Sequence, residues 1–338
     1  MKEPVKNIDL EKKIFAASAR DFNALAIELF RYQYEYNPVY RQYCDLQKTD
    51  ADKIEFTQQI PFLPISFFKT HEIKTGEFEP EAIFESSGTT QTGNSRHLVK
   101  DVSVYHKSFM SCFEKFYGST GSKCILGLLP SYLEREHSSL VMMVDELIKS
   151  SNNELSGFYL YDHEKLQRTI MHNEILKKPT LLIGVTWALL DFAEQFPMQL
   201  RNTIVMETGG MKGRRKEITR QEVHAILQKQ LGLSLIHSEY GMTELLSQAY
   251  SKGDGIFHSP PWMKILLRDE DDPLHVFEVK EEDGKPANGV INIIDLANIN
   301  SCSFIATDDA GRLHSNGSFE VLGRVDNSDV RGCSLMVI

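Results

Sequence analysis

Cysteine is scarce in this sequence, and its few cysteines lie far apart. The chain has five among 338 residues, an odd number, and no C-x-x-C pair occurs. A disulfide framework or a structural zinc site needs cysteines in paired, closer spacing. Neither is therefore indicated, and we expect a reducing, cytoplasmic compartment. The cysteines are Cys44, Cys112, Cys124, Cys302 and Cys333.

Long apolar runs and an excess of positive charge are also missing. The longest apolar stretch, near residues 181–190, contains Gly184 and Thr186 and falls well short of the ~20 residues that span a membrane. The first residues, MKEPVKNIDLEKKI, are charged where a signal peptide is apolar. The net charge of -10 argues against binding to a nucleic-acid backbone. We expect no membrane span and no nucleic-acid partner.

Common nucleotide and hydrolase motifs are absent. The sequence has no G-x-x-x-x-G-K-[ST], no G-x-G-x-x-G after a strand, no G-x-S-x-G and no H-E-x-x-H. Residues 118–123, GSTGSK, have the wrong spacing for a phosphate loop and indicate a turn. His237, at the end of LSLIHS, is a candidate ligand or base, although such a histidine more often caps a strand end.

Alternating strands and helices dominate the middle of the chain. Short apolar runs typical of buried strands are KCILGLL, TLLIGVT, TIVMET and LSLIHS, and helical patterns such as SSLVMMVDELIKS and WALLDFAEQF lie between them. Thr219 and Glu222 form a capping box before a helix that Gly232 should end. This alternation predicts an α/β fold, a mainly parallel sheet flanked by helices.

The regions before and after this middle part have different sequence patterns. Residues 10–35 have helical periodicity, whereas Pro61 and Pro64 exclude a long helix in IPFLPISFFKTHEI. After residue 255 the runs HVFEVK, GVINIID, CSFIAT and SFEVLG predict a β-rich subdomain. We expect one large domain, residues 1–325, and a short tail, 326–338. Within the domain we expect a helical lead-in at 1–60, an α/β core at 80–250 and a β-rich part at 255–322.

Residues 85–95, ESSGTTQTGNS, stand out by composition. Eight of the ten residues after the glutamate are Ser, Thr or Gly, and none is acidic or large and apolar. Such composition is found in flexible linkers. It also suits a phosphate cradle, because glycines allow close backbone approach and hydroxyl and N–H groups bind an anion without bulk. Polar loops METGGMKGRR and HSEYGMTE follow predicted strands, and this segment follows AIFE, a further candidate strand. Ligands of open α/β sheets bind at such strand ends, which disfavours the linker.

Four segments occur in an informative order: SSGTTQTG at 86–93, YGMTE at 240–244, TDDAG at 307–311 and GRVD at 323–326, with Gly209 and Gly210 between the first two. In this order they resemble the adenylate-forming superfamily of acyl-CoA synthetases, luciferases and adenylation domains. IPFLPISFFKTHE, HSEYGMTELLSQAYS and the ending RGCSLMVI further resemble the acyl-protein synthetase (LuxE-like) family. The resemblance implies the large-domain fold of these enzymes and ATP-dependent activation of a carboxylic acid as acyl-AMP.

The resemblance also implies roles for individual residues. Thr243 would contact phosphate and Glu244 would bind Mg²⁺, while Tyr240 would lie against adenine. Taken alone, YGMTE would be better explained as the start of a helix, but the other motifs favour the ATP-binding interpretation. Asp309 would bind the ribose hydroxyls, although the usual Thr-Gly-Asp is Thr-Asp-Asp here, and a turn is the alternative. Arg324 would contact ribose or phosphate, or form a surface ion pair. The remaining ATP-binding candidates are Ser86, Ser87, Gly88, Thr89, Thr90, Gly93, Gly209, Gly210, Gly241 and Met242.

The end of the sequence departs from the larger superfamily. Acyl-CoA synthetases continue past GRxD into a mobile domain of roughly a hundred residues that carries the adenylation lysine. This sequence ends at Ile338, twelve residues past Asp326, so we expect that domain to be absent. Lys264 and Lys69 are weak candidates for the replacement cation. Cys333 instead offers a thiol that could accept the acyl group, or it lies inert in a terminal strand.

Three functions remain open from the sequence. The first is an acyl-protein synthetase that activates a fatty or other carboxylic acid and loads Cys333, for delivery to an NADPH-dependent acyl reductase subunit. The second is a stand-alone adenylating enzyme that passes the acyl group to CoA, a carrier protein or a small amine or hydroxyl. The third is a non-enzymatic adenylate-binding scaffold or sensor. ATP and Mg²⁺ are the expected cofactors of the two enzymes.

Overall fold

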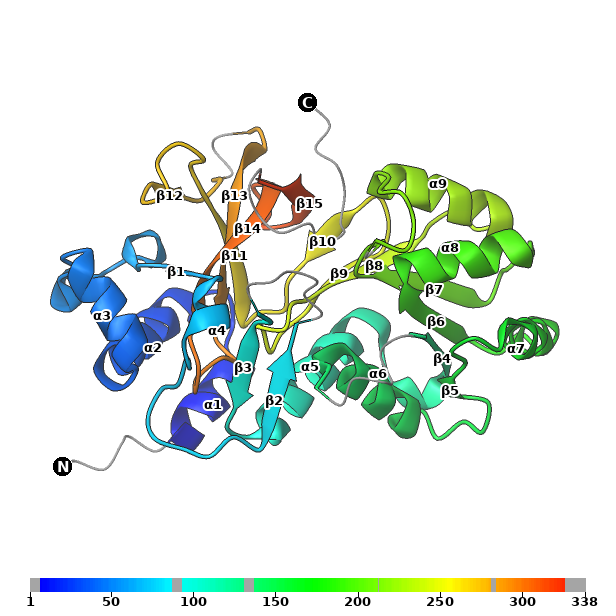
Figure 1. The fold of residues 1–338 in the computed structure, drawn as a ribbon, viewed down its shortest axis with the longest axis horizontal. Coiled ribbons are helices and arrows are strands. Elements are labelled where there is room, and N and C mark those ends of the chain that lie inside the picture. Colours follow the sequence, from blue (N-terminus) through cyan, green and yellow to red (C-terminus); the bar gives the residue numbers. More distant parts are fainter. Residues whose placement is uncertain (1–6, 87–92, 131–136, 212, 281–283, 326–338) are drawn as a thin grey trace. The chain divides into compact units, whose positions relative to one another are not determined.

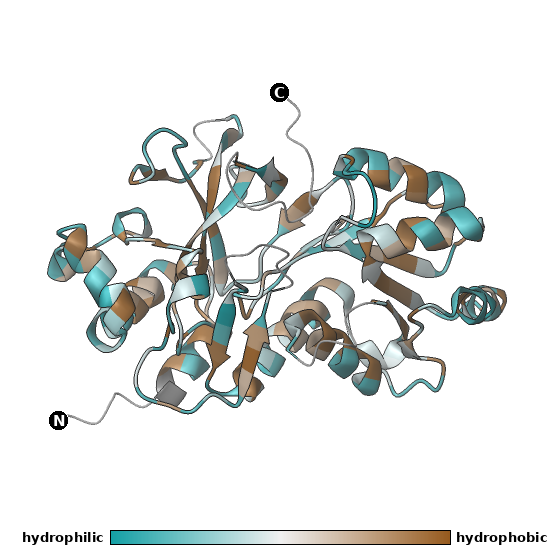
Figure 2. Ribbon diagram, viewed as in Figure 1, coloured by the Kyte–Doolittle hydropathy of each residue, from teal (hydrophilic) through white to brown (hydrophobic). Residues whose placement is uncertain are grey.

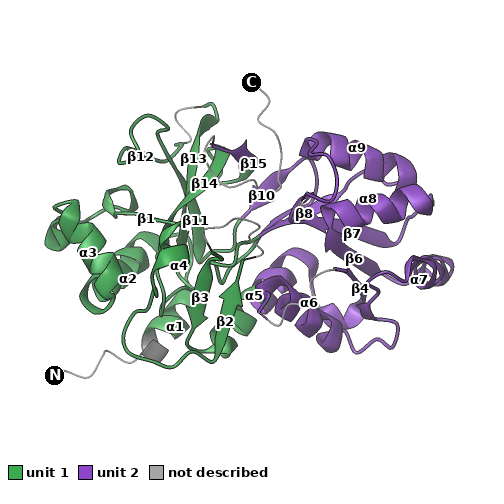
Figure 3. Ribbon diagram, viewed as in Figure 1, with its two compact units in different colours: residues 1–109, 241–248, 259–321 green, residues 110–240, 249–258, 322–338 purple. Residues whose placement is uncertain are grey.

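The computed structural model describes residues 7–86, 93–130, 137–211, 213–280 and 284–325, with side chains from residue 10 onward (Figure 1). Its chain divides into two compact units, coloured in Figure 3. Unit 1 comprises residues 1–109, 241–248 and 259–321. Unit 2 comprises residues 110–240, 249–258 and 322–338. The domain boundaries expected above stay a prediction.

Unit 2 contains the predicted parallel sheet. Its strand order is β10-β9-β8-β7-β6-β4-β5, in which β5, β4, β6, β7 and β8 run parallel and β8, β9 and β10 are antiparallel. The strands are β4 (Cys124–Leu128), β5 (Gly157–Phe158), β6 (Thr180–Val185), β7 (Thr203–Thr208), β8 (His237–Tyr240), β9 (Ala249–Ser251) and β10 (Ile256–His258). The helical elements are η3 (Thr120–Ser122), α6 (Ser139–Ser150), α7 (His163–Ile175), α8 (Thr186–Gln195) and α9 (Arg220–Leu231), together with the second half of α5 (Val102–Tyr117).

The predicted elements of unit 2 form for the reasons expected. Every residue of β4 and β6 is buried, as in a strand covered on both faces. Figure 2 shows alternating hydrophobic and hydrophilic residues along α9, typical of a helix with one face on a sheet. The α9 capping box is present, and Gly232 ends the helix at φ 66°. One prediction is shifted: the fourth strand begins at His237 rather than at residue 233.

Unit 1 contains the predicted β-rich part. Strands β12, β11, β13 and β14 pair in that order and antiparallel, and β1 lies parallel to β14. The strands are β1 (Leu63–Pro64), β2 (Ala82–Glu85), β3 (Arg96–Val99), β11 (Met263–Arg268), β12 (Val276–Phe277), β13 (Ala287–Asp295), β14 (Phe304–Leu313) and the first half of β15 (Phe319–Arg324). The helical elements are α1 (Asn7–Ala16), α2 (Phe22–Tyr36), α3 (Pro38–Leu46), η1 (Ala51–Lys53), η2 (Thr57–Gln59), α4 (Phe67–Thr70) and the first half of α5.

The N-terminal helices pack on the strands of the same unit. The ring of Phe304 lies 6.2 Å from that of Phe30 and 6.0 Å from that of Tyr40, so α2, α3 and β14 share one aromatic core. The side-chain amide of Gln33 donates to the carbonyls of Asn298 and Ile299. The helical periodicity of residues 10–35 is borne out by two helices, and the proline-rich segment holds only the four-residue α4. Among the described residues no helix is both long and apolar enough to cross a membrane.

Candidate functional site

The Ser/Thr/Gly-rich segment connects the two strands of a hairpin. Strands β2 and β3 pair antiparallel, and the last pair in register is Glu85 with Arg96. Beyond it, the Ser86 N–H donates to the Ser95 carbonyl at 3.0 Å, and the Ser95 N–H donates to Ser86 Oγ at 2.8 Å. Gly93 has φ 86°, a conformation that favours glycine. The ends of the segment are therefore tied together, unlike those of a linker.

This hairpin corrects one expectation and leaves others untested. The segment follows an antiparallel two-stranded sheet of unit 1, not the carboxyl end of a strand in the parallel sheet. The predicted phosphate ligands Ser87, Gly88, Thr89 and Thr90 lie outside the described residues, and so does Cys333.

The segment that follows β8 has no helix, so the helix-start interpretation of YGMTE is wrong. Tyr240 is the last residue of β8 and belongs to unit 2, whereas Gly241, Met242, Thr243 and Glu244 belong to unit 1. Glu244 is only 3% exposed. Its burial outside regular secondary structure means that side chains must supply partners for the backbone.

Three side chains supply these partners. His97 on β3 lies with Nδ1 2.9 Å from the Thr243 carbonyl oxygen. Asn298 donates from Nδ2 to the Glu244 carbonyl at 2.8 Å. The Asp295 carboxylate, at the end of β13, accepts from the N–H groups of Leu246 and Ser247 at 2.8 and 2.9 Å. All of these residues belong to unit 1.

Burial determines the charge of two of these anchors. It lowers the pKa of His97 to about 4 against the opposing effect of the Thr243 carbonyl, so the ring is neutral at pH 7 and donates from Nδ1. It also raises the pKa of Asp295 to about 6, although hydrogen bonds from Ser247 and its neighbours lower it. The polar anchors of the 241–248 segment are thus held away from water.

The TDDAG segment lies inside β14, not at the corner of a turn. Val290 pairs with Ala310 and Asn292 with Ala306, so residues 307–309 stand opposite Ile291 alone. Such a bulge re-aims side chains within a strand and is common beside active sites.

Thr307 and Arg268 hold the bulge. Thr307 Oγ1 donates to the Ile291 carbonyl at 2.8 Å and accepts from the N–H of Asp309 at 3.1 Å. Arg268 donates to the Thr307 carbonyl at 2.6 Å. Burial lowers the pKa of Arg268, and the carboxylate of Asp308 opposes that effect. The two neighbouring carboxylates therefore differ: Asp308 interacts electrostatically with Arg268, while Asp309 is buried and 7% exposed.

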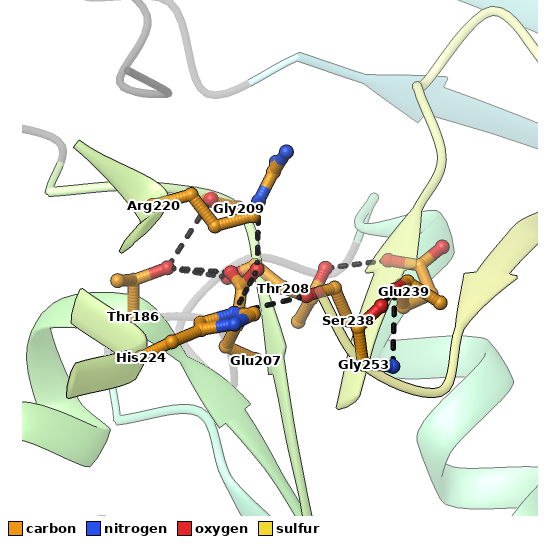
Figure 4. Close-up of polar contacts among 10 residues, drawn as sticks. Thr186, Glu207, Thr208, Gly209, Arg220, His224, Ser238, Glu239 and Gly253 are labelled. Carbon is orange, nitrogen blue, oxygen red and sulfur yellow. Dashed lines mark hydrogen bonds and ion pairs between the residues drawn. The ribbon is translucent and has the colours of Figure 1, made fainter. Parts of the chain in front are cut away.

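The predicted Gly-Gly turn follows β7 in unit 2 and lies above a buried polar network (Figure 4). Gly209 has φ 69°, and its carbonyl accepts from Thr186 Oγ1 at 3.2 Å. The same hydroxyl donates to Glu207 at 3.0 Å. Arg220, from α9, donates to the other oxygen of Glu207 at 3.2 Å.

Glu207 is charged despite its burial. Burial alone would raise its pKa, but His224 and Arg220 outweigh it and hold the pKa at about 2. His224 Nε2 lies 3.6 Å from Glu207 and 3.3 Å from the Ser238 hydroxyl, so the network joins α8, β7, α9 and β8. The Gly-Gly turn is thereby fixed by residues that the sequence alone did not single out.

A pocket opens beside this turn. It encloses about 280 Å³ of empty volume, part of it open to solvent. Thr186 contributes to it together with the Gly-Gly turn. Its lining residues are Thr186, Glu207, Gly209, Gly210, Met211, Glu217, Ile218, Arg220 and Val223.

Glu239, on the neighbouring strand β8 and one residue past Ser238, the register partner of Glu207, behaves differently. Its carboxylate accepts from Thr208 Oγ1 and is 8% exposed. Burial raises its pKa, the Thr208 hydrogen bond lowers it and the charge of Glu207 raises it, so that the pKa is about 7. Glu239 therefore carries a proton in the folded protein at mildly acidic pH.

We expect Glu239 to make the protein less stable as the pH rises from 5 to 7. The unfolded chain releases this proton near the ordinary pKa of 4.5, while the folded chain keeps it up to about 7. The full contribution, about 3 kcal/mol, is present below the unfolded pKa and is lost through this window. Glu239→Gln should flatten the pH dependence of the unfolding free energy, measured by urea titration at pH 5, 6, 7 and 8.

The matched control for this change is Glu154→Gln, at an exposed glutamate of the same unit. It should keep the wild-type slope between pH 5 and 7. An equal slope in Glu239→Gln and wild type would contradict the protonated state assigned to Glu239.

The donor set around Glu244 suits Mg²⁺ held mainly by a nucleotide. Mg²⁺ takes oxygen ligands, typically one or two carboxylates plus substrate phosphates and waters. Glu244 is a buried carboxylate whose backbone Asn298 holds in place. In the part of the chain that the structure describes, no group of three His, Cys, Asp or Glu side chains could hold a metal. The residues fit a single-carboxylate site, not a protein cage.

The other candidates are placed as follows. Ser86, Gly93, Thr243, Glu244 and Asp309 belong to unit 1, whereas Gly209, Gly210, Tyr240 and Arg324 belong to unit 2. Lys264 forms an ion pair with Glu278 at 2.7 Å, and Lys69 lies in the last turn of α4. His237 begins β8 and lies 3.2 Å from the Tyr117 hydroxyl; burial lowers its pKa to about 4.

The four cysteines that the structure describes are buried. Burial raises the pKa of Cys44 to about 12 and also raises the pKa values of Cys124 and Cys302. A thiol attacks an acyl group only as thiolate, so these side chains are poorly suited to nucleophilic work.

Comparison with known proteins adds to this geometry. Residues 12–119 match the model of a family described as acyl-protein synthetase, LuxE. This part of the chain is therefore similar to the LuxE family. The matched segment includes the β2–β3 hairpin, its connecting segment and His97. The chain is also 41% identical over 66 residues to the long-chain-fatty-acid–luciferin-component ligase of Photorhabdus luminescens, a match over 19% of this chain and 56% of the ligase.

Two solved structures share the fold of this chain. ATP-bound MatB of Rhodopseudomonas palustris has a TM-score of 0.53 and 15% identity, over 72% of this chain and 48% of MatB. O-succinylbenzoate coenzyme A synthetase (MenE) of Bacillus subtilis, in complex with ATP and magnesium, has a TM-score of 0.50 and 15% identity, over 74% and 52%. The chain spans about half the length of each. The predicted adenylate-forming type of fold is confirmed.

Proposed function

We propose that the protein is an acyl-protein synthetase that activates a carboxylic acid with ATP and transfers the acyl group to its own Cys333. One observation carries the proposal. The LuxE match contains residues 86–95, a segment whose ends are tied together by hydrogen bonds between Ser86 and Ser95. His97, on the strand that follows this segment, binds the carbonyl of Thr243 in YGMTE. Two segments expected to bind phosphate are thus joined within one unit.

The first half-reaction is adenylation. A carboxylate oxygen attacks the α-phosphorus of ATP, a new P–O bond forms, and the bond to the bridging oxygen breaks to release pyrophosphate. Charge develops on phosphate oxygens, which the N–H and hydroxyl donors of residues 86–93 and Thr243 would stabilise. Mg²⁺, bound through Glu244, would neutralise part of the triphosphate charge. Asp309 would bind the ribose, Tyr240 with the Gly-Gly turn the adenine, and Arg324 ribose or phosphate.

The second half-reaction is acyl transfer. The Cys333 thiolate attacks the acyl carbonyl, a thioester forms, and AMP leaves with the bonding electron pair. The burial and raised pKa values of the described cysteines support Cys333 as the acceptor. Arg331, two residues away, would favour the thiolate. The thioester keeps the acyl group activated for an NADPH-dependent reductase partner.

The substrate class and compartment belong to the same proposal. The matched ligase of Photorhabdus luminescens carries long-chain fatty acid in its name, so we propose a fatty acid as substrate. The small number and wide spacing of the cysteines in the sequence favour a reducing, cytoplasmic location.

The proposed function is tested by ATP–pyrophosphate exchange that depends on added fatty acid and Mg²⁺. Within it, Thr89→Ala should lower the exchange rate by about 10²-fold, the typical cost of removing one preorganised donor to a developing oxyanion. Thr89→Ser keeps the hydroxyl and should retain most of the activity. Wild-type exchange in Thr89→Ala would leave the segment without a role in phosphate binding. Exchange that is absent from the wild type with every fatty acid would overturn the function.

A further inference from the structure

His97 connects two segments that are 146 residues apart in the sequence. It lies on β3, the strand that follows the Ser/Thr/Gly-rich segment. Ser95, whose N–H donates to Ser86 Oγ, lies only two residues before it. Its partner is the carbonyl of Thr243. That carbonyl is part of the peptide bond that joins Thr243 to Glu244, the two residues of YGMTE with the closest proposed contact to phosphate and metal.

The surroundings of His97 fix the ring. Its side chain is 1% exposed, and the rings of Phe68 and Phe84 meet it edge to face at 5.9 and 6.4 Å. A carbonyl oxygen can only accept, so Nδ1 must carry the hydrogen. Packing therefore sets the plane of the ring, and the hydrogen bond sets the tautomer.

The next peptide is held in the same way. Asn298 donates to the Glu244 carbonyl, so two consecutive carbonyls, those of residues 243 and 244, are each bound by a side chain. The two donors come from different elements: β3, and the residues just after β13. Because no helix orients these two peptides, the hydrogen bonds determine the orientation of the backbone at residues 243 and 244.

We propose that His97 is a positioning residue. It holds the backbone of Thr243 and Glu244 in a fixed position relative to the β2–β3 hairpin, whose connecting segment is proposed to bind phosphate. This role rests on the proposed adenylation. It would couple the two segments, because a displacement of β3 would be passed to the Thr243–Glu244 peptide through one buried hydrogen bond. His97 itself need not touch ATP.

The experiment separates the hydrogen bond from the packing of the ring. His97→Phe keeps an aromatic ring but removes the donor, whereas His97→Asn places an N–H at the position of Nδ1, two bonds from Cβ. We expect His97→Phe to lower kcat for ATP–pyrophosphate exchange about 10-fold, the typical effect of one lost hydrogen bond on an orienting group. KM for the fatty acid should be unchanged. His97→Asn should recover most of the rate.

Each result decides one question. Equal losses in the two variants would assign His97 to packing alone, and normal exchange in a folded His97→Phe would overturn its role. His71→Phe, at an exposed histidine of the same unit, is the control and should behave as wild type. Absence of exchange in the wild type would overturn the proposed function instead.

A spectroscopic measurement tests the geometry without any activity. Nitrogen-15 NMR of the histidine rings should show His97 as the neutral tautomer protonated at Nδ1, and its signal should vanish in His97→Asn. A tautomer protonated at Nε2 would overturn the hydrogen bond to Thr243 and the inference with it.

Discussion

Glu244→Gln is expected to reduce fatty-acid-dependent ATP–pyrophosphate exchange by at least about 10²-fold while the protein stays folded. The amide keeps the size and shape of the carboxylate but not its charge, and a neutral amide is a much weaker ligand for Mg²⁺. Glu244 is 3% exposed, so water has little access to take the place of the lost carboxylate ligand. Asn298 binds the backbone carbonyl of residue 244, a contact that the substitution leaves unchanged.

Exchange rates should be measured over a range of Mg²⁺ concentrations, with circular dichroism to follow unfolding. Glu77→Gln is a matched control, because Glu77 is an exposed glutamate of the same unit. It should retain the wild-type rate. Unchanged exchange in Glu244→Gln together with a lower unfolding temperature would assign Glu244 a structural role instead.

Cys333→Ala is expected to abolish covalent labelling of the protein by fatty acid while sparing ATP–pyrophosphate exchange. The thiol acts only after acyl-AMP has formed, so its loss should block the second half-reaction and not the first. Wild-type protein incubated with ATP, Mg²⁺ and labelled fatty acid should retain label through denaturation. Neutral hydroxylamine should release that label, because it cleaves thioesters.

Two other cysteines provide the controls for this experiment. Cys112 and Cys302 are fully buried, and Cys112→Ala and Cys302→Ala should keep the label. Label that persists in Cys333→Ala, or that maps to another residue, would show that the tail is not the acceptor. A stand-alone adenylating enzyme that passes the acyl group to CoA, a carrier protein or an amine would then be the better proposal.

Local sequence patterns were sufficient for much of unit 2. The run TIVMET coincides with β7, and the Thr219–Glu222 capping box with Gly232 bounds α9 as expected. These features depend on residues within a few positions of one another, since burial of a short apolar run and the capping of a helix are local matters. The order of the polar segments likewise indicated the adenylate-forming fold before any contact was known.

The sequence by itself determined the α/β class, the identity of the polar segments and their chemistry. Only the tertiary structure decided how they are held. His97, Asp295, Asn298 and Glu207 looked like ordinary strand or loop residues, because the site partners described above lie 146, 48, 54 and 13 positions away from them. Local propensity favoured a helix at YGMTE, yet buried side chains from β3 and the end of β13 bind its carbonyls and keep it irregular. The bulge at residues 307–309 depends on register with β13, which no local pattern encodes.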